Sequence, residues 1–318
     1  MFNLAIIGLG SWGERLVESV QGKSDIVRFT HAVSRDPSRL ADFSTTHGIA
    51  TSDDYDAVLS DPAVDGVVVS GAGHLHAPQG IEAATAGKHV LVIKPFANYR
   101  KDAEALRDAA RKSGVLAALG YDRCFSPAVH ALRERVGTLG KIIHAEGNFC
   151  VDRYRGYTAG DWKTSLESNP PGSLADHMLY TMIELVGPVA HLSAQGMSQV
   201  VTEDFVDSST VMMRFSSGAS GSLTAIGVTP IFHRLHLFGS EGWAEIRGNT
   251  WLEVHTRQGK PEILNLAPTD MLKAELETFA AAASGTAKWP VSMEVAIAGV
   301  AALEAMRDSA RSGKPVVM

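Results

Sequence analysis

The chain has 318 residues, of which 45% are hydrophobic and 20% are charged, which is typical of a globular protein with about two domains. Its formal net charge of −6, without any run of lysines or arginines, argues against a nucleic-acid partner or an acidic membrane surface. Cys124 and Cys150 have no metal-type spacing, and no segment resembles a signal peptide or a membrane span. We therefore expect a cytoplasmic protein without a disulfide framework, a membrane anchor or a metal site.

The first part of the chain, residues 1–120, alternates short apolar runs with helical patterns. The predicted strands cover residues 4–10, 27–34, 65–73, 88–93 and 115–120, and the predicted helices cover 12–22, 36–48, 77–87 and 98–114, the last of them capped by Asn98. Strands and helices that alternate at this spacing form βαβ units, with helices on both faces of a parallel sheet. This part therefore predicts a doubly wound Rossmann domain.

The pattern changes after Gly120. Helices are predicted at 127–137 and 173–187, and strand-like runs with period-2 alternation at 141–151, 190–201, 207–218, 219–228, 234–248 and 250–257. We predict that residues 121–318 form an α+β domain with a large, mostly antiparallel sheet. The helical C-terminal part, 270–313, belongs to this domain or packs back on the first one.

A glycine-rich turn joins the first predicted strand to the first predicted helix. It reads Gly8-Leu9-Gly10-Ser11-Trp12-Gly13, and this G-x-G-x-x-G spacing predicts a loop that binds the pyrophosphate of a dinucleotide. The second predicted strand ends on Ser34 and Arg35, with Arg39 one helical turn further on. An acidic residue at this strand end binds the ribose of NAD, whereas small and basic residues accommodate the phosphate of NADP, so we expect NADP to be preferred over NAD.

A lysine fixed by a proline follows a buried strand in the stretch VLVIKPFAN, residues 90–98. Proline restricts the backbone of the residue before it, which favours a Lys94 side chain held in one direction. His74 and His76 follow another predicted strand, at the edge where open α/β sheets bind ligands, although two ordinary loop histidines fit equally well. In the helix 173–187, Asp176 and Tyr180 share one face.

These segments together resemble the Gfo/Idh/MocA family of oxidoreductases. The similar segments are GLGSWG, HLHAPQGIEAATAGKHVLVIKPFA, YDRCFSPAV and SARSGKPVVM, so that the resemblance covers nearly the whole chain. It implies that Lys94 lies beside the nicotinamide and acts with the substrate hydroxyl. In the family, the peptide bond at the position of Lys94-Pro95 is often cis. His76 is implied to contact the cofactor. Two departures are Ile93, which replaces the family's glutamate, and Ala72-Gly73, which replaces Pro-Asn.

The resemblance also implies a substrate site on the helix 173–187. Aligned from the preceding turn, Asp176 and Tyr180 occupy the family's two polar positions. Aligned from the end of the helix, His177 and Ser173 occupy them instead. We favour Lys94, Asp176 and Tyr180 as catalytic residues, and we expect His177 to contact the substrate, together with Arg153 and Trp162 of the irregular stretch 152–171.

The sequence therefore predicts an NAD(P)-dependent dehydrogenase or reductase of a hydroxylated small molecule, namely a sugar, a polyol or a dihydrodiol. The alternatives are a non-catalytic dinucleotide-binding regulator and an NAD-dependent glycosidase of the same fold. We also expect a homodimer or homotetramer, because alternating apolar residues such as Val211, Met213 and Phe215 would form an exposed patch on the second sheet.

Overall fold

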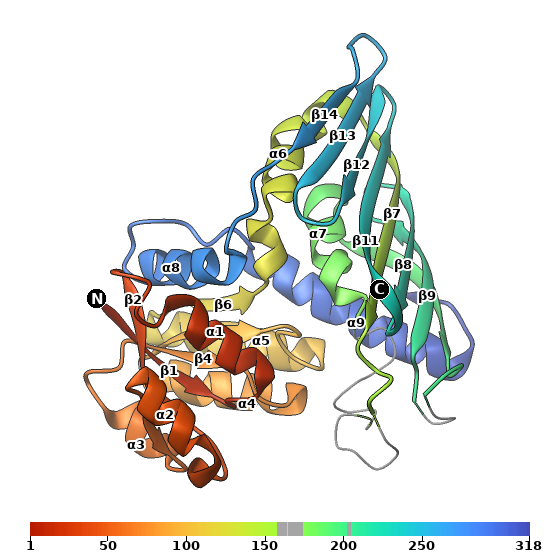
Figure 1. Cartoon of the computed structure of the whole chain (residues 1–318). Coiled ribbons are helices and arrows are strands. Elements are labelled where there is room, and N and C mark those ends of the chain that lie inside the picture. The colour runs from red at the N-terminus through yellow and green to blue at the C-terminus, as the bar shows by residue number, and fades with distance from the viewer. Residues whose placement is uncertain (158–163, 165–173, 202–204) are drawn as a thin grey trace. The chain divides into compact units, whose positions relative to one another are not determined.

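The computed structural model describes residues 1–157, 164, 174–201 and 205–318, and its contacts divide the chain into two compact units (Figure 1). Unit 1 comprises Met1–Asp122 and Asp270–Met293, and unit 2 comprises Arg123–Thr269 and Glu294–Met318. Each unit contains its own sheet and its own hydrophobic core. The fold class predicted from the sequence, a Rossmann sheet followed by an α+β part, is confirmed.

The sheet of unit 1 has six parallel strands in the order β3-β2-β1-β4-β5-β6, which is the doubly wound order of dinucleotide-binding domains. The strands are β1 (Phe2–Ile7), β2 (Val27–Val33), β3 (Ala50–Ser52), β4 (Gly66–Val69), β5 (His89–Ile93) and β6 (Ala117–Gly120). The helices are α1 (Ser11–Val20), α2 (Ala41–His47), α3 (Tyr55–Ser60), α4 (Gly73–Thr85), α5 (Arg100–Ser113) and α8 (Met271–Ala283). The central strand β4 is buried throughout because helices cover both faces of the sheet.

Helix α8 completes the core of unit 1, although it lies far along the chain. Its Leu272, Leu276 and Phe279 are buried in one cluster with Leu16 and Val20 of α1. The partition predicted from the sequence, 1–120 and 121–318, left the place of these last helices open. In the structure, residues 270–293 belong with the Rossmann sheet.

Three predicted helix starts are wrong in detail. Residues 36–48 form a 3-10 turn, Pro37–Leu40, followed by α2, and α4 begins at Gly73, so that Pro78 lies inside the helix rather than in its first turn. Helix α5 begins at Arg100, with Tyr99 at the N-cap and no side-chain cap, instead of being capped by Asn98. The polar side chain of Asn98 lies near Gly73 instead, which is a contact with a segment distant in sequence.

The sheet of unit 2 has nine strands in the order β14-β13-β12-β11-β7-β10-β9-β8-β15. All neighbours are antiparallel except β7 and β10. The strands are β7 (Ile142–Asp152), β8 (Val189–Met197), β9 (Ser208–Phe215), β10 (Ser220–Ile226), β11 (Val228–Gly239), β12 (Gly242–Arg247), β13 (Trp251–Thr256), β14 (Glu262–Asn265) and β15 (Val316–Val317). The helices are α6 (Pro127–Arg135), α7 (Asp176–Val186) and α9 (Met293–Ser312).

One face of this sheet packs on helices and forms the core of unit 2. Val211, Met213 and Phe215 of β9 point into that core and are 0%, 5% and 1% exposed. The expectation that these three residues form an exposed patch is therefore wrong. Period-2 alternation identifies one apolar face of a strand, and here α7 and α9 cover that face. No helix among the described residues is long and apolar enough to cross a membrane.

Candidate active site

The glycine-rich turn after β1 brings two loops into close contact. Gly8 has a positive φ of 89°, and a Cβ atom there would lie 2.5 Å from the Cα of Gly71, which no side chain could tolerate. A Cβ atom on Gly13 would lie 3.0 Å from both the carbonyl oxygen of Gly8 and the hydroxyl of Ser70. Gly8 therefore makes the turn, and Gly13 lets α1 approach the strands.

The N-terminus of α1 is left open for a ligand. Gly10 is the N-cap residue, no side chain caps the helix, and nothing described lies within 4 Å of the position that a Cβ atom on Gly10 would occupy. The first amides of the helix belong to Ser11, Trp12 and Gly13, and such amides, at the positive end of the helix dipole, bind phosphate. The residues predicted to hold a pyrophosphate thus form a backbone cradle that fits one.

The end of β2 places two exposed guanidinium groups beside this edge of the sheet. The amide of Ser34 donates to the carbonyl oxygen of Ser52 at 2.9 Å, which fixes the turn. Arg35 and Arg39 follow on the surface. The carboxylate of Asp36 accepts from the hydroxyl of Ser38 at 2.6 Å and is therefore engaged within the turn. This arrangement leaves cations, rather than a carboxylate, at the strand end that selects between NAD and NADP.

Lys94 follows β5 directly and is partly buried. Its amide donates to the carbonyl oxygen of Gly120 at the end of β6, at 3.1 Å, and the peptide bond between Lys94 and Pro95 is cis. Ile93, which stands in the place of the family's glutamate, packs against the apolar core that α8 completes. The backbone of Lys94 is thus fixed between the sheet and the proline.

His76 connects the Lys94 turn to the glycine-rich turn. Its ring is 1% exposed, with Nδ1 at 2.7 Å from the carbonyl oxygen of Pro95 and Nε2 at 3.1 Å from that of Gly71, the residue that touches Gly8. Burial lowers the pKa of His76, while the two carbonyl contacts oppose that shift. These contacts favour a positioning role for His76 over the direct cofactor contact expected from the sequence. His74, in contrast, is exposed.

Gly73 explains one departure from the family's sequence. A Cβ atom at this position would lie 3.3 Å from Oδ1 of Asn98 and 3.7 Å from the ring of Pro95. The glycine therefore allows the first turn of α4 to approach the segment that carries Lys94. Sequence reasoning identified Gly73 only as a substitution, because its neighbours Pro95 and Asn98 are more than 20 positions away.

Helix α7 carries the other candidate catalytic residues, in unit 2. Asp176 is its first residue, and both Asp176 and Tyr180 are 1% exposed. The ring of Tyr180 lies against the backbone of α9, where a Cβ atom on Gly299 would meet it at 2.0 Å. His177 points elsewhere and stacks on the ring of Phe149 with centroids 4.0 Å apart. The two alignments thus place the second polar position on differently packed faces of α7, at Tyr180 or at His177, and Ser173 lies outside the described residues.

A polar cluster behind His177 was not predicted. Phe149 is stacked between His177 and His233, and the guanidinium of Arg123 lies 4.8 Å from its centroid. Arg123 also donates to Nδ1 of His233 and to Oδ1 of Asn249, both at 3.1 Å. Burial, and secondarily Arg123, lower the pKa of His233 to about 4, so that His233 is neutral at pH 7.

This cluster forms part of the wall of a pocket within unit 2. The pocket is lined by Arg123, Ser126, Val129, His177, Met178, Thr181, Leu235, Ile246, Gly248 and Asn249. Arg123 lies in the segment that resembles the entry to the family's second domain, but His233 is 110 positions away. The pairing of β11 with β7 places His233 beside Phe149, whose ring Arg123 also contacts.

The remaining candidate substrate residues follow β7. Arg153 is exposed, and its amide donates to the carbonyl oxygen of Gly227 at 2.9 Å. Its neighbour Arg155 pairs with Asp152 at 3.1 Å. Trp162 lies outside the described residues. The candidate catalytic residues are divided between the units, with Lys94 in unit 1 and the residues of α7 in unit 2. No cluster of metal-ligating side chains occurs among the residues described.

Comparison with known proteins places this geometry in context. Residues 2–121 match the model of the Gfo/Idh/MocA oxidoreductase family with an NAD-binding Rossmann fold, and residues 129–245 match the family's C-terminal domain. Two scyllo-inositol 2-dehydrogenases of Bacillus subtilis are similar in sequence. The one named for NADP(+) is 26% identical over 284 residues, 85% of this chain and 80% of its own. The one named for NAD(+) is 27% identical over 259 residues, 75% and 71% of the two chains.

Solved structures share the whole fold. A levoglucosan dehydrogenase in complex with NADH and L-sorbose has a TM-score of 0.88 and 20% identity, over 99% of this chain and 98% of its own. The aldose-aldose oxidoreductase of Caulobacter crescentus, complexed with glycerol, has a TM-score of 0.82 and 24% identity, over 100% and 99% of the two chains. At these identities the likeness establishes the fold of both units.

Proposed function

The chain belongs to the Gfo/Idh/MocA family of NAD(P)-dependent oxidoreductases, and we propose that it transfers a hydride between a nicotinamide dinucleotide and a hydroxyl-bearing carbon of a sugar, polyol or dihydrodiol. The observation that carries this proposal is the carboxyl edge of the sheet in unit 1. At this edge the ring of His76 contacts Pro95, beside Lys94, and also Gly71, which lies against Gly8 of the glycine-rich turn. His76 thus connects the Lys94 turn to the loop before the open N-terminus of α1. The similar inositol and levoglucosan dehydrogenases support the substrate class.

The side chains would divide the chemistry between them. A bound dinucleotide supplies or accepts the hydride at its nicotinamide ring. Gly8, Gly10, Ser11, Trp12 and Gly13 would hold its pyrophosphate. Lys94 would hold or transfer the proton of the substrate hydroxyl, with Tyr180 as its partner or as the alternative proton carrier. Asp176 would orient the hydroxyl. His177 and Arg153 are the described residues that we expect to contact the rest of the substrate.

The cofactor preference is a further part of the proposal. Ser34, Arg35 and Arg39 offer a hydroxyl and two cations where NAD-selective proteins have an acid, and a charge-assisted contact with a phosphate contributes about 1.5–3 kcal/mol. We therefore expect NADP to bind more tightly than NAD. Calorimetric titration of both measures the difference, and equal dissociation constants would refute the preference.

Turnover tests the function itself. The purified protein is incubated with NADP or NAD and a panel of sugars, polyols and dihydrodiols, and the absorbance of reduced nicotinamide is followed. We expect at least one member of the panel to give a steady increase in this absorbance. Tight dinucleotide binding without turnover on any member would favour a dinucleotide-binding regulator instead.

We also propose a homodimer or homotetramer in the cytoplasm. The face of the large sheet opposite α7 and α9 carries stacked rings, with His236 on Phe238 and Trp243 on His255. Met212 and Ile263 on the same face are 70% and 55% exposed. These rings and exposed apolar side chains lie among ion pairs such as Arg234–Glu146, and a mixed face of this kind supports association. Light scattering at micromolar concentration should give a mass of two or four times 33.9 kDa, and a monomer would contradict the proposal.

Two buried free cysteines support the proposed cytoplasmic location, because a reducing compartment keeps thiols free.

A further inference from the structure

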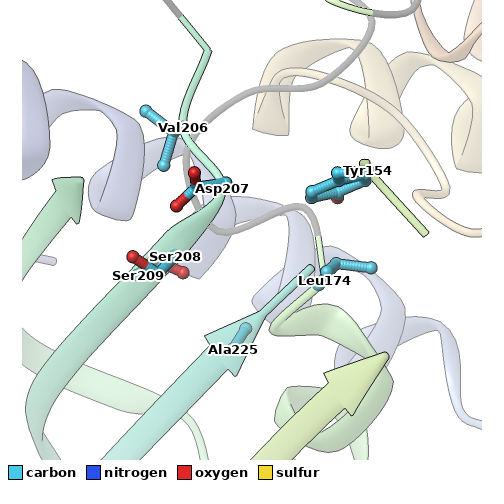
Figure 2. A pocket seen from close by; sticks show the side chains of 7 residues that line it. All are labelled: Tyr154, Leu174, Val206, Asp207, Ser208, Ser209 and Ala225. Carbon is cyan, nitrogen blue, oxygen red and sulfur yellow. The ribbon is translucent and has the colours of Figure 1, made fainter. Parts of the chain in front are cut away.

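A second pocket in unit 2 lies at one end of the large sheet. It is bordered by the segment after β7, the start of β9 and the end of β10, with Asp207 and Val206 on one side and Tyr154 and Leu174 on the other (Figure 2). Ser208, Ser209 and Ala225 are the other described residues of the lining. The described part of the pocket thus combines hydroxyl and carboxylate oxygens with one aromatic ring.

Asp207 is the unusual member of this lining. It is 1% exposed, and its Oδ2 accepts hydrogen bonds from the amides of Gln199, Val200 and Val201 at 2.9, 2.6 and 3.2 Å. Its Oδ1 is also buried, but no hydrogen-bond partner for that oxygen occurs among the described residues. A buried carboxylate oxygen without a donor is costly, so a donor from outside the protein would gain a strong contact there.

The chemistry of the lining narrows the choice of donor. An ionised carboxylate only accepts, so the ligand must present an O–H or N–H group. The hydroxyls of Ser208 and Ser209 can both donate and accept, which suits a ligand with several hydroxyls. The ring of Tyr154 and the side chain of Leu174 offer an apolar surface beside them. The free space of the cavity is about 10 Å³, which is room for one hydroxyl group rather than for a whole ligand.

The pocket is continuous in sequence with the candidate catalytic helix. Leu174, in its wall, stands two residues before Asp176, which begins α7, so their Cα atoms are at most about 7 Å apart. We infer that Asp207 forms a distal subsite, in which Oδ1 accepts a hydrogen bond from a substrate hydroxyl that is not the one oxidised. The inference rests on the proposed function and specifies its substrate as a compound with at least two hydroxyl groups, separated along the molecule.

The variant Asp207→Asn tests this subsite. Asparagine keeps one acceptor oxygen for the amides of residues 199–201 and presents an NH₂ donor where Oδ1 accepts. Calorimetric titration, with the reduced cofactor NADPH present so that no polyol is oxidised, would compare a polyol that binds the wild type with its analogue lacking one hydroxyl. If the missing hydroxyl is the one held by Asp207, we expect the wild type to bind the polyol about tenfold more tightly than the analogue. This factor is a difference in binding free energy of about 1.4 kcal/mol. The variant should bind both ligands equally weakly.

Asp308→Asn is the matched control, because Asp308 pairs with Arg311 on the exposed side of α9. It should keep the wild-type preference. If Asp207→Asn weakens both ligands by the same factor, or changes neither, Asp207 only anchors the turn 199–201 and the subsite is refuted. A melting temperature that depends on sodium or potassium in the wild type but not in Asp207→Asn, without any preference between polyols, would identify a cation site and overturn the inference.

The same experiment separates this inference from the proposed function. Binding is measured without turnover, so a preference that depends on Asp207 supports the subsite even if no panel member is oxidised. In that case the hydride-transfer proposal fails and the subsite stands. The opposite outcome has two parts: the wild type oxidises a polyol, and Asp207→Asn still binds the polyol more tightly than its deoxy analogue. This outcome would support the enzyme and refute the subsite.

Discussion

Lys94 is the side chain on which the proposed chemistry depends most. If it holds or moves the proton of the substrate hydroxyl, Lys94→Ala should lower kcat by about 10²–10⁴-fold. The dissociation constant for NADP should change little, because the glycine-rich turn and the end of β2 supply the predicted pyrophosphate and ribose contacts. Steady-state kinetics and cofactor titration measure the two effects, with exposed Lys112 of α5 changed to alanine as the control. Full turnover by Lys94→Ala would remove this residue from the catalytic set.

Tyr180 and His177 can be distinguished by removing one functional group from each. Tyr180→Phe deletes only the hydroxyl and keeps the ring that packs against Gly299, so the fold should be retained. We expect it to lower kcat more than His177→Ala does, because Asp176 and Tyr180 share a face of α7. The comparison requires kcat for both variants with the same substrate. A nearly normal Tyr180→Phe beside a severely impaired His177→Ala would support the alternative alignment.

Glu275 predicts a dependence of stability on pH. This residue of α8 is 1% exposed, and burial, reinforced by Asp122, raises the pKa of its carboxyl well above the usual range. The folded state therefore keeps a proton that the unfolded state loses above about pH 4.3, and stability falls as pH rises through the folded pKa. Glu275→Gln cannot ionise. We expect its melting temperature to match the wild type near pH 4 and to exceed it at pH 8.

The control for this prediction is Glu18→Gln, on the exposed side of α1. Its melting temperature should change between pH 4 and pH 8 by the same amount as that of the wild type. The expected result requires that too few donors stabilise the ionised carboxylate of Glu275 in its buried position. The backbone amide of Tyr121 is one such donor. A Glu275→Gln variant that is less stable than the wild type at pH 8 would show that the carboxylate is well solvated or paired.

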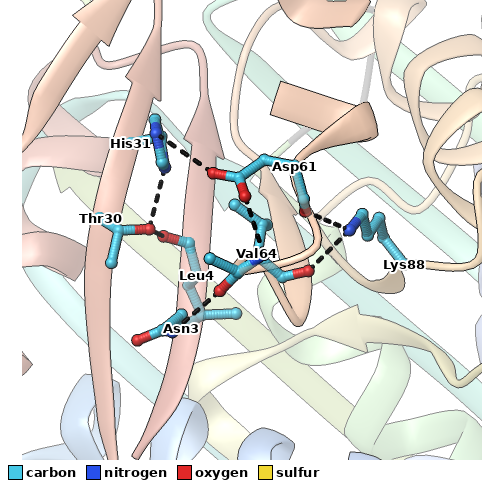
Figure 3. Close-up of polar contacts among 8 residues, drawn as sticks. Asn3, Leu4, Thr30, His31, Asp61, Val64 and Lys88 are labelled. Carbon is cyan, nitrogen blue, oxygen red and sulfur yellow. Dashed lines mark hydrogen bonds and ion pairs between the residues drawn. The ribbon is translucent and has the colours of Figure 1, made fainter. Parts of the chain in front are cut away.

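At the scale of elements, the connection between α3 and β4 depends on one buried lysine. Lys88 is 8% exposed, and its ammonium donates to the carbonyl oxygens of Asp61 and Val64 at 2.6 and 2.8 Å (Figure 3). The carboxylate of Asp61 lies 3.8 Å from the ring of His31 on β2. The two lysine contacts fix the segments just before β4 and β5, at the edge of the sheet opposite the dinucleotide loop.

Replacement of Lys88 by methionine keeps the length of the side chain but removes both hydrogen bonds. Two carbonyl oxygens would lose their donor, and each unsatisfied group costs about 1–3 kcal/mol. We expect Lys88→Met to lower the free energy of unfolding by about 2–4 kcal/mol in urea titrations, without changing the affinity of the folded protein for NADP. Lys101→Met, on the exposed side of α5, is the control. Equal stability of the two variants would mean that water replaces the lysine.

At the scale of the whole molecule, the alternation of strands and helices in the Rossmann domain and the dinucleotide loop could be predicted because their signals are local, whereas the three-residue strand β3 was not predicted. A strand, a G-x-G-x-x-G turn and a helix follow each other within the first 20 residues. The contacts of His233 and Arg123, and the pocket at Asp207, could not be predicted, because they depend on strand pairing across long separations. The outward face of β9 was assigned wrongly, since alternation alone does not tell which face the helices cover.

The unit that contains the dinucleotide loop is built from two segments separated by 147 residues, since Asp122 is followed within it by Asp270. A ribosome therefore releases α1 and all six parallel strands long before it has made α8, whose Leu276 and Phe279 cover them. While residues 123–269 are made, the nascent chain exposes an apolar surface that α8 later buries. Completion of the first domain thus waits until residues 270–293 are translated, and a chaperone that shields this surface in the interval would raise the yield of folded protein.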